Sequence, residues 1–119
     1  MFKVIVAGGR DFSDYELLCS TLDHLLSRKT DVEIVSGVAR GADSLGIRYA
    51  GEKLIPVRRF PADWDRDGNT AGYKRNVRMA GYADACVCFW DGKSRGTADM
   101  IRVARLYKLE VRVIKYRKP

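Results

Sequence analysis

The sequence lacks the usual marks of a secreted, membrane-spanning or metal-binding protein. It contains 3 cysteines and 1 histidine in 119 residues. An odd number of cysteines, with Cys86 and Cys88 inside an apolar run, argues against the disulfide framework of small secreted domains. No His, Cys or carboxylate cluster has the spacing of a zinc site, and no apolar run approaches the roughly 20 residues that span a bilayer. We therefore expect a cytoplasmic protein with no membrane partner, metal ion or cofactor.

Two common nucleotide-binding motifs are also missing. Gly8-Gly9 follows the first apolar run, but Phe12-Ser13 occupies the region where the third glycine of a GxGxxG fingerprint belongs. The second apolar run ends in Ser36-Gly37, where a dinucleotide site has an acidic residue. Gly92-Lys93-Ser94 resembles the end of a Walker A motif, yet Val87 stands in place of its first glycine. These gaps argue against a conventional NAD-binding protein and against a P-loop NTPase.

What the sequence does contain is a regular alternation of strand-like and helix-like segments. Apolar runs of strand length lie at residues 3–7, 32–36, 55–59, 85–90 and 111–114. Segments of helical periodicity begin at Ser13 and cover 42–53, 71–82 and 97–107, and 61–70 is a long loop. This alternation is typical of βαβ units. We expect one α/β domain over residues 1–119, a Rossmann-like doubly wound sheet of five parallel strands in the order 3-2-1-4-5.

Local signals add detail to this expectation. Ser13 and Glu16 have the spacing of a capping box at the start of the first helix. Pro56 cannot donate a ladder hydrogen bond, so it favours an edge position for the third strand. Helical periodicity predicts that Val77 faces the core from the third helix and Tyr107 from the fourth.

Glycine-rich loops follow the first, second and fourth strands. In the expected order, strands one and four are neighbours at the switch point, beyond whose carboxyl ends ligands bind. Glycine lets the backbone approach a ligand closely, a helix N-terminus binds anions, and the net charge of +7 favours an anionic ligand. The candidate ligand-binding residues are Gly8, Gly9, Arg10 and Asp11 after strand one, Ser36, Gly37, Arg40, Gly41 and Asp43 after strand two, Lys93, Ser94, Arg95, Gly96 and Thr97 after strand four, and Arg75 and Asn76 from the third helix.

Some of these candidates have a second interpretation. Asp43 lies in the first turn of a helix, where it can cap the helix, orient Arg40 or bind a ribose hydroxyl. Arg75-Asn76 belongs to a basic run that is equally typical of a solvated helix face. Trp64 and Trp90 either stack on a base or cover the sheet.

Taken together, these segments resemble the SLOG superfamily of Rossmann-like nucleotide-binding proteins, in particular its small YspA-like branch. The resemblance implies a nucleotide or a derivative as ligand, of the ADP-ribose or cyclic signalling type. It also implies a homodimer that pairs through helices beside the ligand crevice, with Met79, Tyr82 and Tyr107 as candidates. The matching segments are Gly8-Gly9-Arg10-Asp11-Phe12, Ser36 to Asp43, Pro61-Ala62-Asp63-Trp64, Arg75-Asn76 with Met79, and Ala83-Asp84 through Phe89-Trp90 to Gly96-Thr97.

Two related families define the alternatives. Lonely-guy phosphoribohydrolases have a catalytic glutamate at the position that Met100 occupies here, and Asp99 lies one residue short of it. The DNA-processing protein of natural transformation shares the Ser-Gly-x-Ala-Arg-Gly segment and the Arg-Asn pair, and it binds single-stranded DNA. Three functions therefore stay open. The chain is a nucleotide-binding sensor, carrier or sink, a hydrolase of such a ligand with Asp99, Asp43 or Asp11 as acid or base, or a single-strand nucleic-acid-binding protein.

Overall fold

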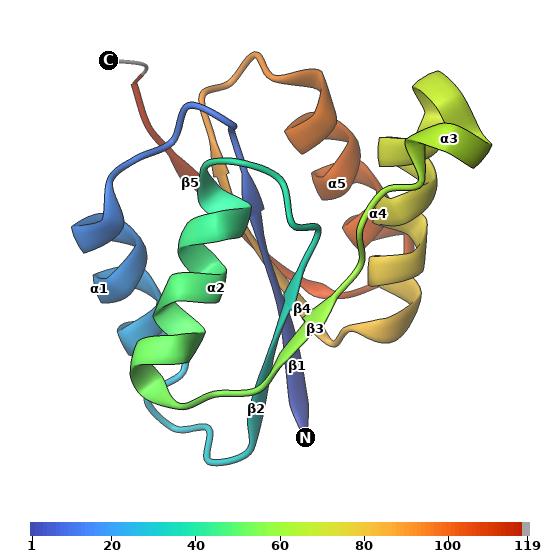
Figure 1. Ribbon diagram of the computed structural model, residues 1–119. Helices are drawn as coiled ribbons and strands as arrows, with labels where there is room; N and C mark the ends of the chain where they lie inside the picture. Colours follow the sequence, from blue (N-terminus) through green and yellow to red (C-terminus); the bar gives the residue numbers. More distant parts are fainter. Residues whose placement is uncertain (118–119) are drawn as a thin grey trace.

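A five-stranded parallel sheet forms the centre of the molecule (Figure 1). The computed structural model describes residues 1–117. The sheet order is β3-β2-β1-β4-β5, which confirms the expected Rossmann-like, doubly wound fold. The strands are β1 (Phe2–Gly8), β2 (Val32–Ser36), β3 (Val57–Arg59), β4 (Ala85–Trp90) and β5 (Glu110–Lys115).

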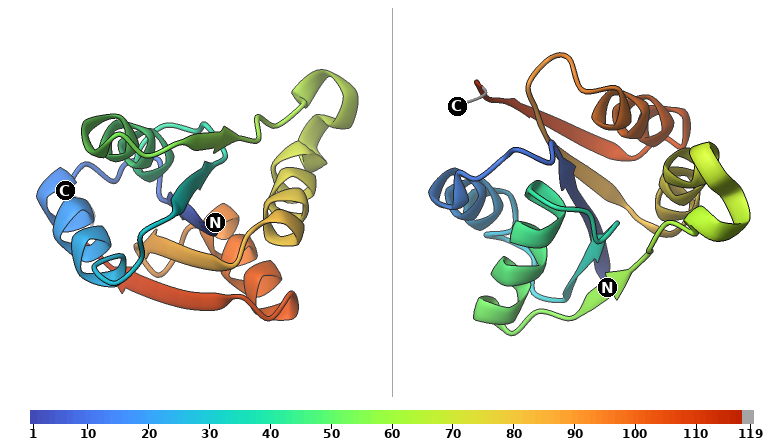
Figure 2. Two further views of the ribbon diagram at one scale, coloured as in Figure 1. Left: turned by 90° about the horizontal axis from the view of Figure 1, so that it is seen from below. Right: turned by 45° about the horizontal axis from the view of Figure 1, so that its top comes forward.

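Helices cover both faces of this sheet. Figure 2 shows α1 (Tyr15–Leu25) and α2 (Ala42–Lys53) on one face, and α4 (Ala71–Tyr82) and α5 (Arg95–Leu106) on the other. The short α3 (Trp64–Asp67) and the 3-10 turn η1 (Gly68–Thr70) precede α4 and lie at the outer end of that layer.

The central strands are apolar on both faces because each face meets a helix layer. In β1, Val4 and Val6 pack toward α1 and α2, whereas Ile5 packs with residues of α4 and α5. In β4, Phe89 packs with the residues of α1 and α2, and Cys88 packs with those of α4 and α5. Successive side chains of a strand point to opposite faces of the sheet. This double burial fixes the register of both strands, since a slip of one residue would exchange the two faces.

The first helix begins differently from the expectation. Its N-cap is Asp14, whose carboxylate accepts a hydrogen bond from the N–H of Leu17 at 3.0 Å. The predicted capping box of Ser13 and Glu16 is therefore wrong. Asp14 is an equally good capping residue, and it lies three positions before the N–H that it satisfies.

The predicted loop at 61–70 is partly helical. Asp63 caps α3 by accepting from the N–H of Arg66 at 3.0 Å. The third strand starts at Val57, two residues later than expected, and it is an edge strand as predicted. Pro56 stays outside the strand, although its carbonyl oxygen accepts from Ile34 at 2.9 Å.

Two expected core residues are exposed. Val77 is exposed because the buried positions of α4 are Ala71, Asn76, Met79 and Ala80. Tyr107 is also exposed, since α5 ends at Leu106 and the ring lies beyond the packed helix face. The prediction for Val77 was wrong because the buried stripe of α4 is centred on other residues, and that for Tyr107 was wrong because α5 ends before it.

The cysteines and helices give no sign of a disulfide or a membrane span. Cys19, Cys86 and Cys88 are free thiols, and the last two lie in the core with their Sγ atoms 3.4 Å apart. Within residues 1–117, no helix is long and apolar enough to cross a bilayer. The cytoplasmic location stays a prediction.

Candidate functional site

A cavity of about 490 Å³ lies beyond the carboxyl ends of β1 and β4. The loops after both strands line it, so Gly9 and Gly96 meet at one edge of the sheet, as the strand order predicts. Ala7, Met79 and Met100 give it an apolar floor. The remaining lining residues are Gly8, Arg10, Asp11, Ala39, Asp43, Trp64, Asn69, Gly72, Tyr73, Arg75, Asn76, Asp91, Ser94 and Thr97.

The loop after β1 is held by backbone contacts on two sides. The N–H of Gly9 donates to the Phe89 carbonyl at 3.0 Å, and the Gly9 carbonyl accepts from the Ala42 N–H at 3.2 Å. A Cβ on Gly8 would collide with the Phe89 carbonyl and with Ala42. Glycine is therefore required here for close approach between β1, β4 and α2. Arg10 and Asp11 follow this fixed loop and line the cavity, and Asp11 Oδ1 accepts a hydrogen bond from the hydroxyl of Tyr116.

Arg75 connects α4 to the loop after β2. Its Nη1 donates to the Gly37 carbonyl at 2.6 Å, and its Nε donates to Asn76 Oδ1 at 3.1 Å. A Cβ on Gly37 would lie 2.5 Å from Nη1 and 2.8 Å from Asp43 Oδ2. Gly37 thus leaves open a space that the guanidinium of Arg75 and the carboxylate of Asp43 both border.

Asp43 is buried at the edge of the cavity, with 4% of its surface exposed. It does not cap α2, whose N-cap is Gly41, because its Oδ2 accepts from the Ala39 N–H at 3.3 Å. Burial raises the pKa of Asp43, and the positive charges of Arg75 and Arg10 oppose that rise. A carboxyl group with a raised pKa in a cavity is a candidate for ligand contact or proton transfer.

Asn76 joins α4 to α5 and is almost fully buried. Its Nδ2 donates to Asp99 Oδ2 at 3.1 Å and to the Gly96 carbonyl at 3.5 Å. Asp99 Oδ1 in turn accepts from Arg102 at 2.8 Å. Asn76 lines the cavity, but Asp99 does not. Met100 lies in the floor, at the position of the phosphoribohydrolase glutamate.

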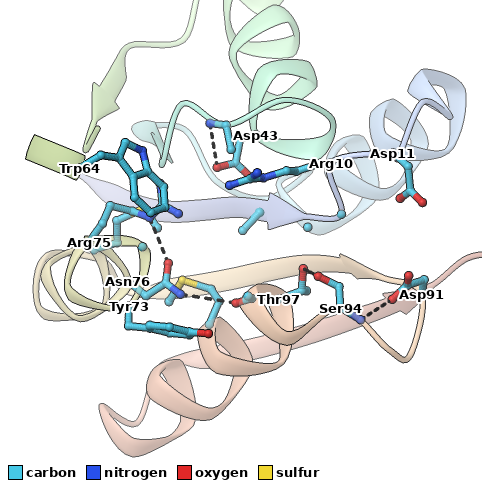
Figure 3. Close-up of a pocket in the computed structure, with 18 of the residues that line it drawn as sticks. Arg10, Asp11, Asp43, Trp64, Tyr73, Arg75, Asn76, Asp91, Ser94 and Thr97 are labelled. Carbon is cyan, nitrogen blue, oxygen red and sulfur yellow. Dashed lines mark hydrogen bonds between the residues drawn. The ribbon is translucent and has the colours of Figure 1, made fainter. Parts of the chain in front are cut away.

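The first turn of α5 forms the opposite wall (Figure 3). Asp91 Oδ1 accepts from the N–H groups of Lys93 and Ser94, both at 2.8 Å, which shapes the turn into the helix. Ser94 Oγ and Thr97 Oγ1 are 3.4 Å apart at its start. The first N–H groups of a helix have no carbonyl partner within it, so they are available to an anion.

Two aromatic rings stand at the other end of the cavity. Trp64 from α3 and Tyr73 from α4 are 54% and 46% exposed, and Figure 3 shows them away from Ser94 and Thr97. Trp90 differs, because its Nε1 donates to the Ser94 carbonyl at 3.1 Å and the ring does not line the cavity. The lining residues Tyr73, Asn69 and Gly72 were absent from the candidate set. The only feature of the sequence that pointed to these three residues was that they lie in or next to the predicted loop at 61–70.

Several predicted site residues lie outside this cavity. Lys93 and Arg95 are exposed and do not line it. Ser36 is buried, and its Oγ donates to the Asp43 carbonyl at 3.2 Å. Gly41, with a φ of 76°, packs against the backbone of the loop after β1. Gly37 and Arg40 line a neighbouring cavity of about 310 Å³.

The fold and the position of the cavity define a Rossmann-like α/β domain with polar loops at its switch point. The model of the YspA, cpYpsA-related SLOG family (YAcAr) matches residues 2–66, more than half of the chain. The chain belongs to this family, which confirms the SLOG resemblance.

Two comparisons extend this result. The chain is 35% identical to the Gene 61 protein of Mycobacterium phage D29 over 114 residues, covering 88% of this chain and 90% of that protein. It also resembles DNA processing protein A from Helicobacter pylori, whose structure was described for its single-stranded DNA binding mode. That match has a TM-score of 0.69 and 19% identity, and it covers 98% of this chain and 66% of the other. At that identity the second match establishes a shared fold.

Proposed function

We propose that the cavity at the ends of β1 and β4 binds a phosphate-bearing nucleotide derivative. The observation that carries the proposal is that one cavity combines guanidinium groups, a helix N-terminus and two exposed aromatic rings. Arg10 suits phosphate, because a guanidinium group binds phosphate oxygens in pairs of hydrogen bonds. Arg75 adds positive charge to the same cavity, while its Nε and Nη1 donate to Asn76 and Gly37. Trp64 and Tyr73 offer faces on which a base can stack. In this proposal the chain acts as a sensor, carrier or sink for the ligand.

The carboxylate of Asp43 has a place in the same proposal. It is the buried acceptor between the two arginines, and hydroxyl groups of a ribose would donate to it. The cavity volume lies within the range of about 300–1,000 Å³ usual for small-molecule sites.

Hydrolysis of the ligand has weaker support. Asp99 is engaged by Asn76 and Arg102 and does not line the cavity, and Met100 has no acid–base chemistry. Asp43 and Asp11 do line it, so either is the candidate acid or base if turnover occurs. Chromatography of each nucleotide after incubation with the protein distinguishes hydrolysis from binding, because only the former forms product.

Single-stranded nucleic acid is the second candidate ligand. The structural similarity to DNA processing protein A and the net charge of +7 favour it. Such binding would spread over many phosphate contacts, so affinity would fall steeply and linearly with the logarithm of salt concentration. A compact nucleotide site would show a shallow salt dependence.

Calorimetric titration of alanine variants tests the proposal. We expect Arg10→Ala and Arg75→Ala each to weaken nucleotide binding by about 10- to 150-fold, the effect of one charge-assisted hydrogen-bonding group worth roughly 1.5–3 kcal/mol. The ligands are AMP, ADP-ribose, a cyclic dinucleotide and a short oligothymidylate, each at two salt concentrations. Arg28→Ala is the control, since this exposed arginine lies in the turn after α1 and lines none of the cavities described. Binding of the oligothymidylate alone, equally affected by all three variants, would contradict the proposal.

A further inference from the structure

A second cavity adjoins the first and shares a wall with it. It is lined by Gly37, Val38, Ala39 and Arg40 from the loop after β2 and by Pro61 and Ala62 before α3. Arg10, Ala39, Trp64 and Arg75 line both cavities. The two cavities therefore adjoin along these four residues.

Three guanidinium groups from three separate elements surround this second cavity. Arg10 follows β1, Arg40 follows β2, and Arg75 belongs to α4. Among residues 1–117, none of the three has a carboxylate within 4.0 Å. Burial and the nearby charge of Arg10 both lower the pKa of Arg75, and only Asp43 opposes them. Such a concentration of positive charge is stabilised when an anion enters between the groups.

Trp64 lies where the two cavities adjoin. It lines both cavities and also a shallow third one with Asp65, Arg66 and Arg78. The residue is 54% exposed. An exposed aromatic ring beside basic side chains can stack on a base of an extended nucleotide ligand.

We propose that the ligand carries two phosphate-linked nucleotide units, the first in the main cavity and the second in the cavity of Arg40. This inference rests on the proposed function and names the ligand class, a dinucleotide unit rather than a mononucleotide. Arg10 and Arg75 contact the linking phosphates, Arg40 contacts the second unit alone, and Trp64 stacks on a base. Free dinucleotides and single strands share this chemistry, and the ligands of the test separate them.

The test compares one-unit and two-unit ligands on matched variants. AMP, 5′-phosphorylated diadenylate, ADP-ribose and oligothymidylate are titrated into wild type, Arg40→Ala and Arg28→Ala. We expect diadenylate to bind at least about tenfold more tightly than AMP, by the value of one further charge-assisted contact. Arg40→Ala removes this gain and leaves AMP binding unchanged, and Arg28→Ala leaves both unchanged. A tighter complex with diadenylate than with oligothymidylate identifies a free dinucleotide, and the reverse order identifies a single strand. ADP-ribose, which carries a second ribose without a base, shows whether the second base contributes.

Tryptophan fluorescence gives an independent readout. A base stacked on Trp64 quenches its emission, so the quenching by diadenylate is lost in Trp64→Phe while the signal of Trp90 persists. We expect Trp64→Ala, which removes the ring, to weaken diadenylate by about 5- to 150-fold, the range for stacking of one base. If AMP binds as tightly as diadenylate, or if Arg40→Ala weakens both equally, the second unit is refuted and the proposed function stands. If wild type binds none of the four ligands, both fail.

Discussion

Gly37 shows how a single missing methyl group shapes the candidate site. A Cβ added to this residue would lie 2.5 Å from Arg75 Nη1 and 2.8 Å from Asp43 Oδ2. We expect Gly37→Ala to displace the guanidinium and to lower the free energy of unfolding by about 1–3 kcal/mol, the usual effect of overpacking. Urea unfolding measures this change.

Gly51 provides the matched control for that substitution. It lies in α2 with nothing within 4 Å of an added Cβ. We expect Gly51→Ala to stabilise the protein by about 0.5–1 kcal/mol, because alanine loses less backbone entropy in a helix. Equal effects of the two alanines would show that Gly37 has no steric role.

The raised pKa of Asp43 leads us to expect that the free energy of unfolding depends on pH. Because burial raises its pKa in the folded state, the folded protein binds the proton more tightly than the unfolded chain. The free energy of unfolding therefore falls as pH rises from the ordinary carboxyl pKa, about 3.9, to the raised pKa of Asp43 in the folded state. Above the raised pKa the contribution of this proton to stability is lost completely. We expect Asp43→Asn to gain stability relative to wild type over this interval.

Urea unfolding at acidic and neutral pH measures the effect. Asp65→Asn is the control, since this exposed aspartate in α3 should follow the wild-type curve in shape. A wild type that gains stability over Asp43→Asn as pH rises would mean that attraction to Arg75 outweighs burial, and would contradict the prediction.

At the scale of elements, the start of α1 distinguishes two capping residues. Asp14 accepts the hydrogen bond from Leu17, and Ser13 lies outside the helix. We expect Asp14→Ala to reduce the free energy of unfolding by about 1 kcal/mol and Ser13→Ala to change it by less than about 0.5 kcal/mol. Thermal unfolding compares the two, and a larger loss at Ser13 would restore the capping box.

For the whole molecule, the homodimer stays a prediction, but its expected interface changes. Met79 is buried on the inner face of α4, so it is withdrawn as an interface residue, and Tyr82 donates a hydrogen bond to Glu33. Val77 and Leu106 are exposed apolar residues on the two helices that cover this face.

We expect light scattering at micromolar concentration to give twice the monomer mass for wild type and the monomer mass for Val77→Asp. Removal of an apolar contact and burial of a charge at the interface would both oppose pairing. Leu54→Asp is the control, because this residue is 91% exposed and follows α2 on the other face of the sheet. A monomeric wild type would refute the dimer.

The strand order and the meeting of the loops after β1 and β4 followed from the sequence alone. Alternating apolar and amphipathic segments require crossover helices, and right-handed crossovers leave few sheet orders. The loops after parallel strands must then share one edge. Gly8 and Gly96 could be assigned to one site for this reason, although they are far apart in the chain.

Which side chains reach the cavity was decided by tertiary structure. Arg75 and Arg95 looked alike as basic residues of predicted site segments, yet Arg75 enters the cavity and Arg95 stays exposed in solvent. The difference arises from contacts between distant segments, such as that of Arg75 with Gly37, 38 residues away. Local periodicity fixes which residues share a helix face, but only the packing of α4 between α5 and the β2 loop determines where that face points.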